Sequence, residues 1–268
     1  MCVFVFVCVC LFADALYFQF QYVCCNIPGP NMPTELFEET INGCLCSGNS
    51  CGTLPDQTCS CQLYGANFCE YGLLRETALS LDSLSVVQEC NSSCSCSKNC
   101  RNRVVQNGIK VRMEVFRDSV KGLCLRALET IERGKFVCEY AGDVLPETEA
   151  RRRLRNLKDG DMNYLFILRE HFQSGVLCTY IDPRNRGNIG RFISHSCCPN
   201  LVIVPVRVLN MVPRVCLFAS RDIAAGEEVT YDYGQHGDQH GTSQESNVIC
   251  SCGADNCRGY LPFDSAGM

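Results

Sequence analysis

Basic residues are absent from the first 74 positions of the chain, and Arg75 is the first lysine or arginine. The apolar stretch Met1–Phe12 has the length of a secretory signal, but it lacks the positive segment with which a signal peptide begins. Long apolar runs are missing too, because Asp14 interrupts this one before the roughly 20 residues that span a bilayer. The sequence therefore favours neither a secretory leader nor a membrane span, and we expect no membrane partner.

The N-terminal stretch has one further interpretation. Alternating cysteine and valine, as in Val7–Cys10, is what a TG dinucleotide repeat encodes. A true start near Phe18 is therefore an alternative, which sequencing the 5′ end of the transcript would test. We treat residues 1–25 as an apolar stretch apart from the rest of the chain.

Tryptophan is absent and histidine is rare, whereas 24 of the 268 residues are cysteine. With 46% hydrophobic and 20% charged residues, the chain can bury a core as one large domain or two small ones. In a short secreted protein, so many cysteines would indicate a disulfide scaffold. This chain is long, and the spacing of its cysteines indicates metal binding instead.

Nine cysteines form two groups between residues 44 and 100. The first group is Cys44, Cys46, Cys51, Cys59 and Cys61, and the second is Cys90, Cys94, Cys96 and Cys100. Zinc takes four tetrahedral ligands, so three ions need about twelve bonds, which nine thiolates supply if three of them bridge two ions each. A disulfide framework is the alternative. Cys69 lies between the groups and is expected to be a small buried hydrophobe.

After Cys100 the sequence alternates apolar and polar residues, as strands do. Strands are predicted at Ile109–Phe116, Phe136–Tyr140, Leu201–Val208 and Val215–Ala219. One clear helix is predicted at Pro146–Arg155, because proline suits the first turn and acidic residues precede basic ones. A glycine-containing turn is predicted at Ala224–Glu227. The fold class is therefore mainly β, a β-rich α+β fold.

The most specific pattern is Arg191–Asn200, which reads Arg-Phe-Ile-Ser-His-Ser-Cys-Cys-Pro-Asn. Tyr231-Asp232-Tyr233 follows it, and then come Cys250, Cys252 and Cys257. With these motifs, residues 43–263 resemble the SET-domain protein-lysine methyltransferases, and among them the SETMAR type of histone-lysine methyltransferase without a transposase segment. The resemblance implies a SET fold in which Arg191–Asn200 threads beneath another loop as a pseudoknot.

The resemblance also implies a division of the chain. Residues 26–43 are a lead-in, 44–107 a pre-SET cluster with three zinc ions, 108–234 the SET catalytic domain, 235–247 a linker, 248–263 a post-SET segment with one zinc ion, and 264–268 a tail. The post-SET zinc ion is expected to bind Cys250, Cys252 and Cys257 together with Cys197 from the pseudoknot, which holds the tail over the lysine channel. Cys198 is a competing ligand, but Cys197 is favoured because the family's ligand directly follows His-Ser.

The activity that the resemblance implies is methyl transfer from S-adenosylmethionine to a lysine of histone H3. The donor is expected to contact the backbone of Lys121, Gly122 and Leu123, and then Tyr164, Arg191, Phe192, Ser194 and His195. Taken alone, Lys121–Gly122 would be interpreted as an ordinary turn. The Arg191–Asn200 segment is much more specific.

Three tyrosines carry the expected chemistry. By resemblance, Tyr233 places the catalytic hydroxyl beside the reacting methyl and amine, and Tyr140 lines the lysine channel and hydrogen-bonds the amine. Tyr231 stands at the family's phenylalanine/tyrosine switch position, which implies mono- or dimethyl-lysine as product. Taken singly, either Tyr140 or Tyr233 would more often be a core residue with a satisfied hydroxyl.

Two residues depart from the family pattern. Ser194 replaces an asparagine, and serine cannot reproduce the two donors of an amide. Gly122-Leu-Cys124 replaces Gly-Trp-Gly, and losing a glycine with positive φ would cost roughly 1–3 kcal/mol of strain. A zinc-stabilised chromatin-binding module with weak or no catalysis is therefore the alternative function.

Charge restricts the partners. The formal net charge is −5, and zinc ions outnumbered by thiolates make the folded protein more acidic still. An acidic surface suits a basic histone H3 tail on a nucleosome and argues against direct DNA binding as the main activity. We expect action in the nucleus, on the chromosome, with Arg151–Arg155 a weak candidate for a localisation signal. Which lysine is the target does not follow from the sequence.

Overall fold

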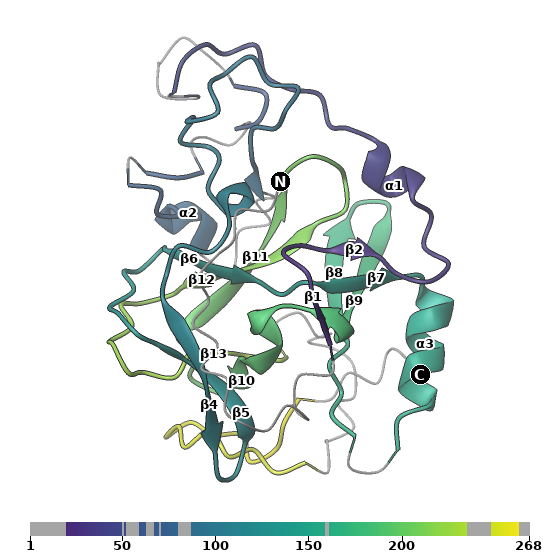
Figure 1. Ribbon diagram of the computed structural model, residues 1–268, viewed down its shortest axis with the longest axis vertical. Helices are drawn as coiled ribbons and strands as arrows, with labels where there is room; N and C mark the ends of the chain where they lie inside the picture. The colour runs from purple at the N-terminus through teal and green to yellow at the C-terminus, as the bar shows by residue number, and fades with distance from the viewer. Residues whose placement is uncertain are drawn as a thin grey trace.

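The computed structural model describes residues 20–49, 51, 59–62, 67–69, 71–79, 87–158, 161–234 and 248–262. Over these ranges the predicted mainly β fold with few helices is confirmed (Figure 1). The expected linker 235–247, the tail 264–268 and residues 1–19 lie outside them. Of the helices that are described, none is long and apolar enough to cross a membrane.

The larger sheet has five strands in the order β1-β9-β7-β2, with β8 also pairing with β9. The strands are β1 (Gln21–Tyr22), β2 (Ile27–Pro28), β7 (Gly142–Leu145), β8 (Phe166–Phe172) and β9 (Gly175–Gly187). The pairs β1–β9 and β2–β7 are parallel. Residues from the N-terminal stretch and the lead-in therefore extend a sheet of the expected SET domain.

A second sheet has the order β3-β11-β12-β6. Its strands are β3 (Val87–Gln88), β6 (Phe136–Glu139), β11 (Leu201–Arg207) and β12 (Arg214–Ala219), and three of them are predicted strands. Phe136 and Phe218 pack with ring centroids 5.5 Å apart, within an apolar core on this sheet. The parallel β3–β11 pair joins the cysteine-rich region to this sheet.

A hairpin of β4 (Met113–Asp118) and β5 (Gly122–Ala127) stands apart from both sheets. The strand predicted from Ile109 begins only at Met113, because its partner β5 ends at Ala127 opposite it. The turn keeps Gly122 at φ +83°, a value that glycine adopts without strain. The predicted turn at Ala224–Glu227 is confirmed by the bond from the Glu227 amide to the Ala224 carbonyl, 3.1 Å.

The helices are short: α1 (Glu35–Glu38), α2 (Glu76–Leu79), α3 (Glu147–Arg155), η2 (Val105–Asn107) and η3 (Ile189–Phe192). The predicted helix is confirmed as α3, with Pro146 at its N-cap. Arg153 of α3 reaches Asp182 at 2.7 Å and Asp143 at 3.2 Å. These bonds connect α3 to the larger sheet. Arg153, which belongs to the weak candidate for a localisation signal, is therefore paired with acidic residues.

Two short strands, β10 (Ser194–His195) and β13 (Thr230–Tyr231), pair in parallel although they lie far apart in the sequence. Ser194 lies opposite Thr230, and His195 lies opposite Tyr231. The amide of Ser196 continues the pairing with a 3.1 Å bond to the Tyr231 carbonyl. This is the juxtaposition of motifs that the pseudoknot predicts.

Candidate functional site

The three predicted catalytic tyrosines lie together. Ring centroids are 6.2 Å apart for Tyr140 and Tyr231 and 4.7 Å apart for Tyr231 and Tyr233. Phe166 of β8 closes the group, 5.6 Å from the Tyr140 ring and 6.4 Å from the Tyr231 ring. These four rings form one compact group. Phe166 lies on β8 and Tyr231 on β13, Tyr140 directly follows β6, and Tyr233 follows β13.

The hydroxyls of this group have fixed partners. Tyr140 donates to the Tyr164 carbonyl at 2.7 Å, and Tyr233 donates to the Ile193 carbonyl at 2.9 Å. Burial raises the pKa of Tyr140, Tyr231 and Tyr233. Although 37% of the Tyr233 surface is exposed, its hydroxyl end points inward to Ile193. All three side chains therefore stay protonated at neutral pH and act as neutral hydrogen-bonding groups.

His195 connects this group to the cysteines near residue 250. Its Nδ1 accepts a 3.2 Å bond from the amide of Tyr233, and its Nε2 lies 3.3 Å from Cys197 Sγ and 3.4 Å from a guanidinium nitrogen of Arg258. Burial lowers the pKa of His195 and favours the neutral ring. A neutral imidazole therefore holds the backbone of Tyr233 against the expected post-SET zinc site.

Arg191 lies among aromatic rings. Its guanidinium carbon is 4.3 Å from the centroid of Phe20, 4.5 Å from that of Tyr164 and 5.5 Å from that of Phe192. One guanidinium nitrogen donates to the Arg184 carbonyl at 3.3 Å. The buried Nε of Arg191 has no hydrogen-bond partner. A buried cationic donor without an acceptor is what a site for an anionic group requires.

Lys121 and Leu123 flank Gly122 at the turn of the β4–β5 hairpin. The Lys121 ammonium forms an ion pair with Glu228, just before β13. The buried Oε1 of Glu228 has no partner. The hairpin turn is therefore tied to the strand that carries Tyr231, as a cofactor site between them requires.

The two departures from the family pattern contact each other. The hydroxyl of Ser194 donates to Cys124 Sγ at 3.2 Å, joining β10 to β5. Cys124 is 0% exposed, and burial raises the pKa of its thiol. Among the described residues other than glycine, only Asn31 has a positive φ. Cys124 therefore has the backbone of an ordinary strand, and replacing the family's glycine costs no strain from a positive φ.

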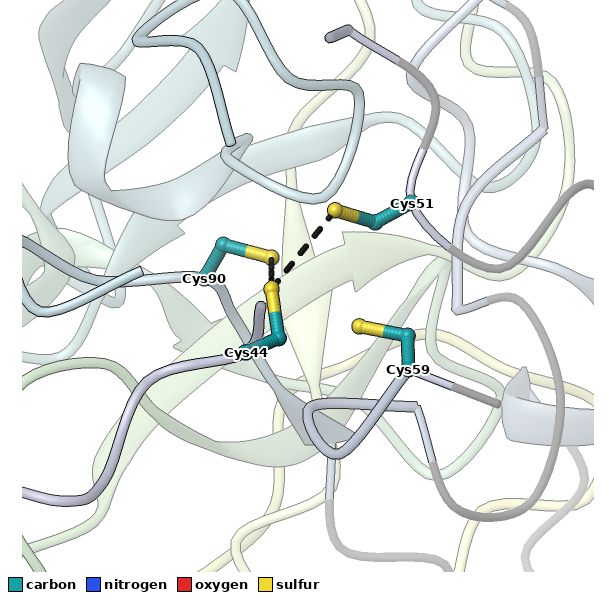
Figure 2. A group of neighbouring side chains, drawn as sticks. All are labelled: Cys44, Cys51, Cys59 and Cys90. Carbon is teal, nitrogen blue, oxygen red and sulfur yellow. Dashed lines mark hydrogen bonds between the residues drawn. The ribbon is translucent and has the colours of Figure 1, made fainter. Parts of the chain in front are cut away.

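Eight of the nine predicted pre-SET ligands fall into three overlapping groups of four sulfurs, each with all sulfurs within 4.8 Å of one another. The groups are Cys44, Cys51, Cys59 and Cys90 (Figure 2); Cys44, Cys61, Cys90 and Cys94; and Cys51, Cys90, Cys96 and Cys100. Cys44 Sγ lies 3.8 Å from Cys51 Sγ and 4.0 Å from Cys90 Sγ. A tetrahedron with zinc–sulfur bonds of about 2.3 Å has edges of about 3.8 Å. The thiol positions therefore fit zinc.

Three sulfurs, those of Cys44, Cys51 and Cys90, belong to more than one group. Cys90 belongs to all three groups, whereas a bridging thiolate joins two ions. Cys46 belongs to none of the groups, but it lies in the same buried cluster and its thiol interacts with that of Cys59. With Cys46 in place of Cys90 beside Cys59, three sulfurs would each be shared by two groups, as nine thiolates around three ions require.

Arg103 neutralises part of this cluster. Its guanidinium donates to Cys96 Sγ at 3.6 Å and to the carbonyls of Cys90 and Asn91 at 3.1 and 2.8 Å. Burial opposes the Cys96 thiolate, but hydrogen bonds from Arg103 and neighbouring thiols lower its pKa on balance. Thiolates are the form that binds zinc, so Arg103 supports the cluster from outside its ligand shell.

Cys197, Cys250, Cys252 and Cys257 form a fourth group of sulfurs within 4.8 Å of one another. Cys197 Sγ lies 3.9 Å from Cys250 Sγ, whereas the side chain of Cys198 is exposed. The structure thus gathers Cys197, and not Cys198, with the three C-terminal cysteines. Cys69, expected to be buried, is only partly buried, because its amide and carbonyl form a surface turn with Leu73 and Gly72.

Several residues at this site carry no motif that sequence reasoning could use. Arg258 donates to Asp232 Oδ1 at 2.6 Å, between the two tyrosines of the Tyr231–Tyr233 element, and its amide donates to Cys197 Sγ at 3.4 Å. Phe20 contacts Arg191 from a segment outside every motif. For Arg258, the one feature that could have indicated a role is its position directly after the predicted ligand Cys257.

Comparison with known proteins agrees with this geometry. Residues 122–234 match the SET domain family. The chain is 42% identical to the mouse histone-lysine N-methyltransferase SETMAR, over 92% of this chain and 82% of that protein. It is equally similar to human SETMAR but spans only 37% of that longer protein. The probable histone-lysine N-methyltransferase set-23 of Caenorhabditis briggsae is 40% identical over 91% of this chain and 97% of its own length.

Solved structures give the same result. The methyltransferase domain of human SETMAR aligns with a TM-score of 0.77 at 41% identity, covering 91% of this chain and 90% of that one. KRYPTONITE in complex with mCHH DNA, an H3(1-15) peptide and SAH aligns with a TM-score of 0.68 at 30% identity, covering 91% of this chain and 48% of that one. This chain belongs to the SET-domain family of histone-lysine N-methyltransferases.

Proposed function

We propose that the chain transfers methyl groups from S-adenosylmethionine to a lysine of histone H3 and yields mono- and dimethyl-lysine. The observation that carries the proposal is the convergence of Tyr140, Tyr231 and Tyr233 beside the Arg191–Asn200 segment. Membership of the histone-lysine N-methyltransferase family supports it, as does KRYPTONITE, which was solved with an H3 peptide and SAH.

The tyrosines would orient the reacting groups and would not act as bases, because burial keeps their hydroxyls neutral. S-adenosylmethionine, when bound, supplies an electrophilic sulfonium methyl group. Tyr233 would present its hydroxyl beside the point where methyl and amine meet, and Tyr140 would orient the amine. Aromatic walls hold a lysine chain and exclude water, and alignment supplies much of the rate gain.

Product choice is assigned to Tyr231. Its hydroxyl end interacts with Tyr140 and lies in the same buried group, where burial raises its pKa. A hydroxyl at that point occupies space and offers the amine a hydrogen bond, which would limit rotation of an already methylated nitrogen. Mono- and dimethyl-lysine are the products expected from such a channel.

The donor site would lie between the β4–β5 hairpin turn and β10. Residues assigned to it are Lys121, Gly122, Leu123, Tyr164, Arg191, Phe192, Ser194 and His195. Two buried atoms without partners, Arg191 Nε and Glu228 Oε1, fit a ligand that carries both a carboxylate and an ammonium group. Complementary charges on protein and donor would fix the orientation of its methyl group.

The zinc sites would hold the parts of the enzyme in register. Nine thiols from Cys44 to Cys100 would bind three ions, and Cys197 with Cys250, Cys252 and Cys257 would bind the fourth. The fourth site joins the Arg191–Asn200 segment to the C-terminal cysteines, so metal binding there would order the tail beside the lysine channel. This division assigns a structural role to all four ions.

The partner we propose is the tail of histone H3 on a nucleosome. The acidic balance of the chain favours a basic peptide, and direct DNA binding is not proposed as its main activity. Action in the nucleus, on chromosomes, follows from a histone substrate. The Arg151–Arg155 stretch gives this little support as a signal, because Arg151, Arg152 and Arg153 pair with acidic residues.

A second candidate is a zinc-stabilised module that binds chromatin without catalysis. The replacement of the expected asparagine and glycine by Ser194 and Cys124 favours it, because Ser194 is assigned to the donor site and Cys124 contacts it. Against it, Tyr140, Tyr233, Arg191 and His195 are all retained and meet at one site. The two candidates differ in whether the donor binds.

The test is calorimetric titration of the full-length, zinc-loaded chain with S-adenosylmethionine, alongside transfer of radiolabelled methyl to histone H3. Donor binding with label on lysine is the expected result. The Tyr233→Phe variant should still bind donor but lose most transfer, whereas Tyr71→Phe, at a site 79% exposed, should behave as wild type. If the folded protein with four zinc ions bound no donor, the proposed activity would be refuted and the chromatin-binding module would remain as the function.

A further inference from the structure

We infer that Phe20, on the segment that precedes the cysteine-rich region, is a positioning residue for the donor site. Resting on the proposed function, this inference extends the site to a segment outside the matched residues 122–234. Phe20 would hold the face of the Arg191 guanidinium, so that its free edge meets the carboxylate of the donor. The apolar N-terminal stretch would then contribute to function at its C-terminal end.

The contact is a cation–π clamp, in which the guanidinium of Arg191 lies over the rings of Phe20 and Tyr164. The guanidinium carbon of Arg191 lies 4.3 Å from the centroid of the Phe20 ring and 4.5 Å from that of Tyr164. Cation–π contacts within about 6 Å are attractive, and they strengthen where water is excluded. Phe20 also meets the ring of Phe192 edge-on, with centroids 6.0 Å apart and an interplanar angle of 66°. These contacts would limit the movement of the guanidinium.

The segment that carries Phe20 is anchored directly after it. Gln21 and Tyr22 pair in parallel with Arg186 and Gly187 of β9, and the amide of Val23 adds a 2.8 Å bond to the Gly187 carbonyl. β9 runs into η3, which contains Arg191, so the same backbone positions both partners of the clamp. Phe20 is therefore held by the sheet and does not depend on a free end of the chain.

The clamp leaves donor groups of Arg191 available. One terminal nitrogen is bonded to the Arg184 carbonyl at 3.3 Å, whereas the buried Nε has no partner. Nε of Arg184 is likewise buried without a partner. A guanidinium fixed by its faces and unpaired along an edge is suited to a planar carboxylate, which accepts hydrogen bonds along that edge. Among the proposed ligands, the amino-acid end of the donor carries such a group.

Positioning through Arg191 predicts a particular kinetic pattern. Loss of the Phe20 ring face would raise KM for S-adenosylmethionine and its Kd by about 5- to 30-fold, as loss of a desolvated cation–π contact does. The kcat at saturating donor and the KM for the H3 peptide would stay within about twofold, because the ring contacts of Phe20 within the described residues are with Arg191 and Phe192 and not with the three tyrosines. A purely structural role would change all of these together.

The experiment compares full-length Phe20→Leu with Tyr22→Ala, at a neighbouring position 45% exposed. Leucine keeps apolar volume against the core, and zinc content and the thermal midpoint report whether folding is intact. We expect weaker donor binding only in Phe20→Leu, and little further effect of that change in an Arg191→Lys background.

Each outcome separates the two claims. Wild-type donor affinity in a folded Phe20→Leu protein would overturn the inference and leave the proposed function intact. If Phe20→Leu weakened donor binding as much in the Arg191→Lys background as in the wild type, the inference would also be overturned, because positioning must act through Arg191. A wild-type chain that binds no donor would overturn the proposed function, and this inference with it.

Discussion

The contact between Ser194 and Cys124 predicts that the two departures from the family pattern compensate each other. Restoring the family residues one at a time, by Ser194→Asn or Cys124→Gly, should harm the protein, whereas the double variant should recover. Ser194 Oγ lies 3.2 Å from a thiol that is 0% exposed, so each residue occupies space that the other leaves.

The magnitude follows from this geometry. Asparagine beside a buried Cys124 thiol would overpack the site, at a cost of about 1–3 kcal/mol. Glycine at Cys124 would remove a hydrogen bond of about 1 kcal/mol and weaken β5 by about 0.5–1 kcal/mol. In the double variant the larger amide can enter the space left by the thiol. We expect a coupling energy of about 1–2 kcal/mol in the free energy of unfolding.

The assay is denaturant unfolding of the zinc-loaded wild type, both single variants and the double variant, which gives the free energy of unfolding of each. The control cycle pairs Ser194→Asn with Cys216→Gly. Cys216 is also 0% exposed and also lies on a strand, but it packs in the core of the second sheet. Effects in the control cycle should add within about 0.5 kcal/mol. Additivity in the Ser194–Cys124 cycle as well would refute the reasoning.

Other predictions concern single residues. Cys197→Ser should reduce bound zinc from four ions to three by elemental analysis, whereas Cys198→Ser should retain four, since only Cys197 joins the fourth group; equal losses would contradict this. Arg258→Ala should cost less than about 1 kcal/mol of unfolding free energy, because its pair with Asp232 is 48% and 24% exposed, yet lower kcat with zinc retained. Tyr231→Phe should shift the product towards trimethyl-lysine by mass spectrometry, and an unchanged product would remove its assigned role. N-ethylmaleimide at pH 8 should label exposed Cys198 and spare Cys138 and Cys216, because burial raises the pKa of both and leaves almost no thiolate.

The N-terminal stretch, residues 1–25, contains a strand and an aromatic residue that contact the SET domain. From its composition, removal of residues 1–25 looks harmless. β1 lies within that range and pairs with β9, and Phe20 contacts Arg191. A chain lacking the whole stretch would lose both, so weak donor binding by such a chain would say nothing about Ser194 or Cys124.

The sequence by itself predicted the fold class from its strand patterns and the family from the resemblance of its motifs, and the number and spacing of its cysteines predicted zinc ligands. A zinc site requires several thiols that lie close together, and C-x-C pairs place two of them side by side. The nine pre-SET cysteines and the C-terminal group could therefore be predicted as ligands from the sequence. The short apolar runs that mark β6, β11 and β12 are likewise a property of neighbouring residues. The Arg191–Asn200 segment is long enough to be specific.

Only the tertiary structure decided which distant residues meet. Ser194 and Cys124 are separated by 70 positions and Arg191 and Phe20 by 171, and no periodicity links either pair. From the sequence, Cys124 would be strained only if its backbone needed a positive φ, and the structure shows that it does not. Contacts between strands are set by register and by how sheets pack. They become visible only when the chain has folded, because no single segment encodes its partner.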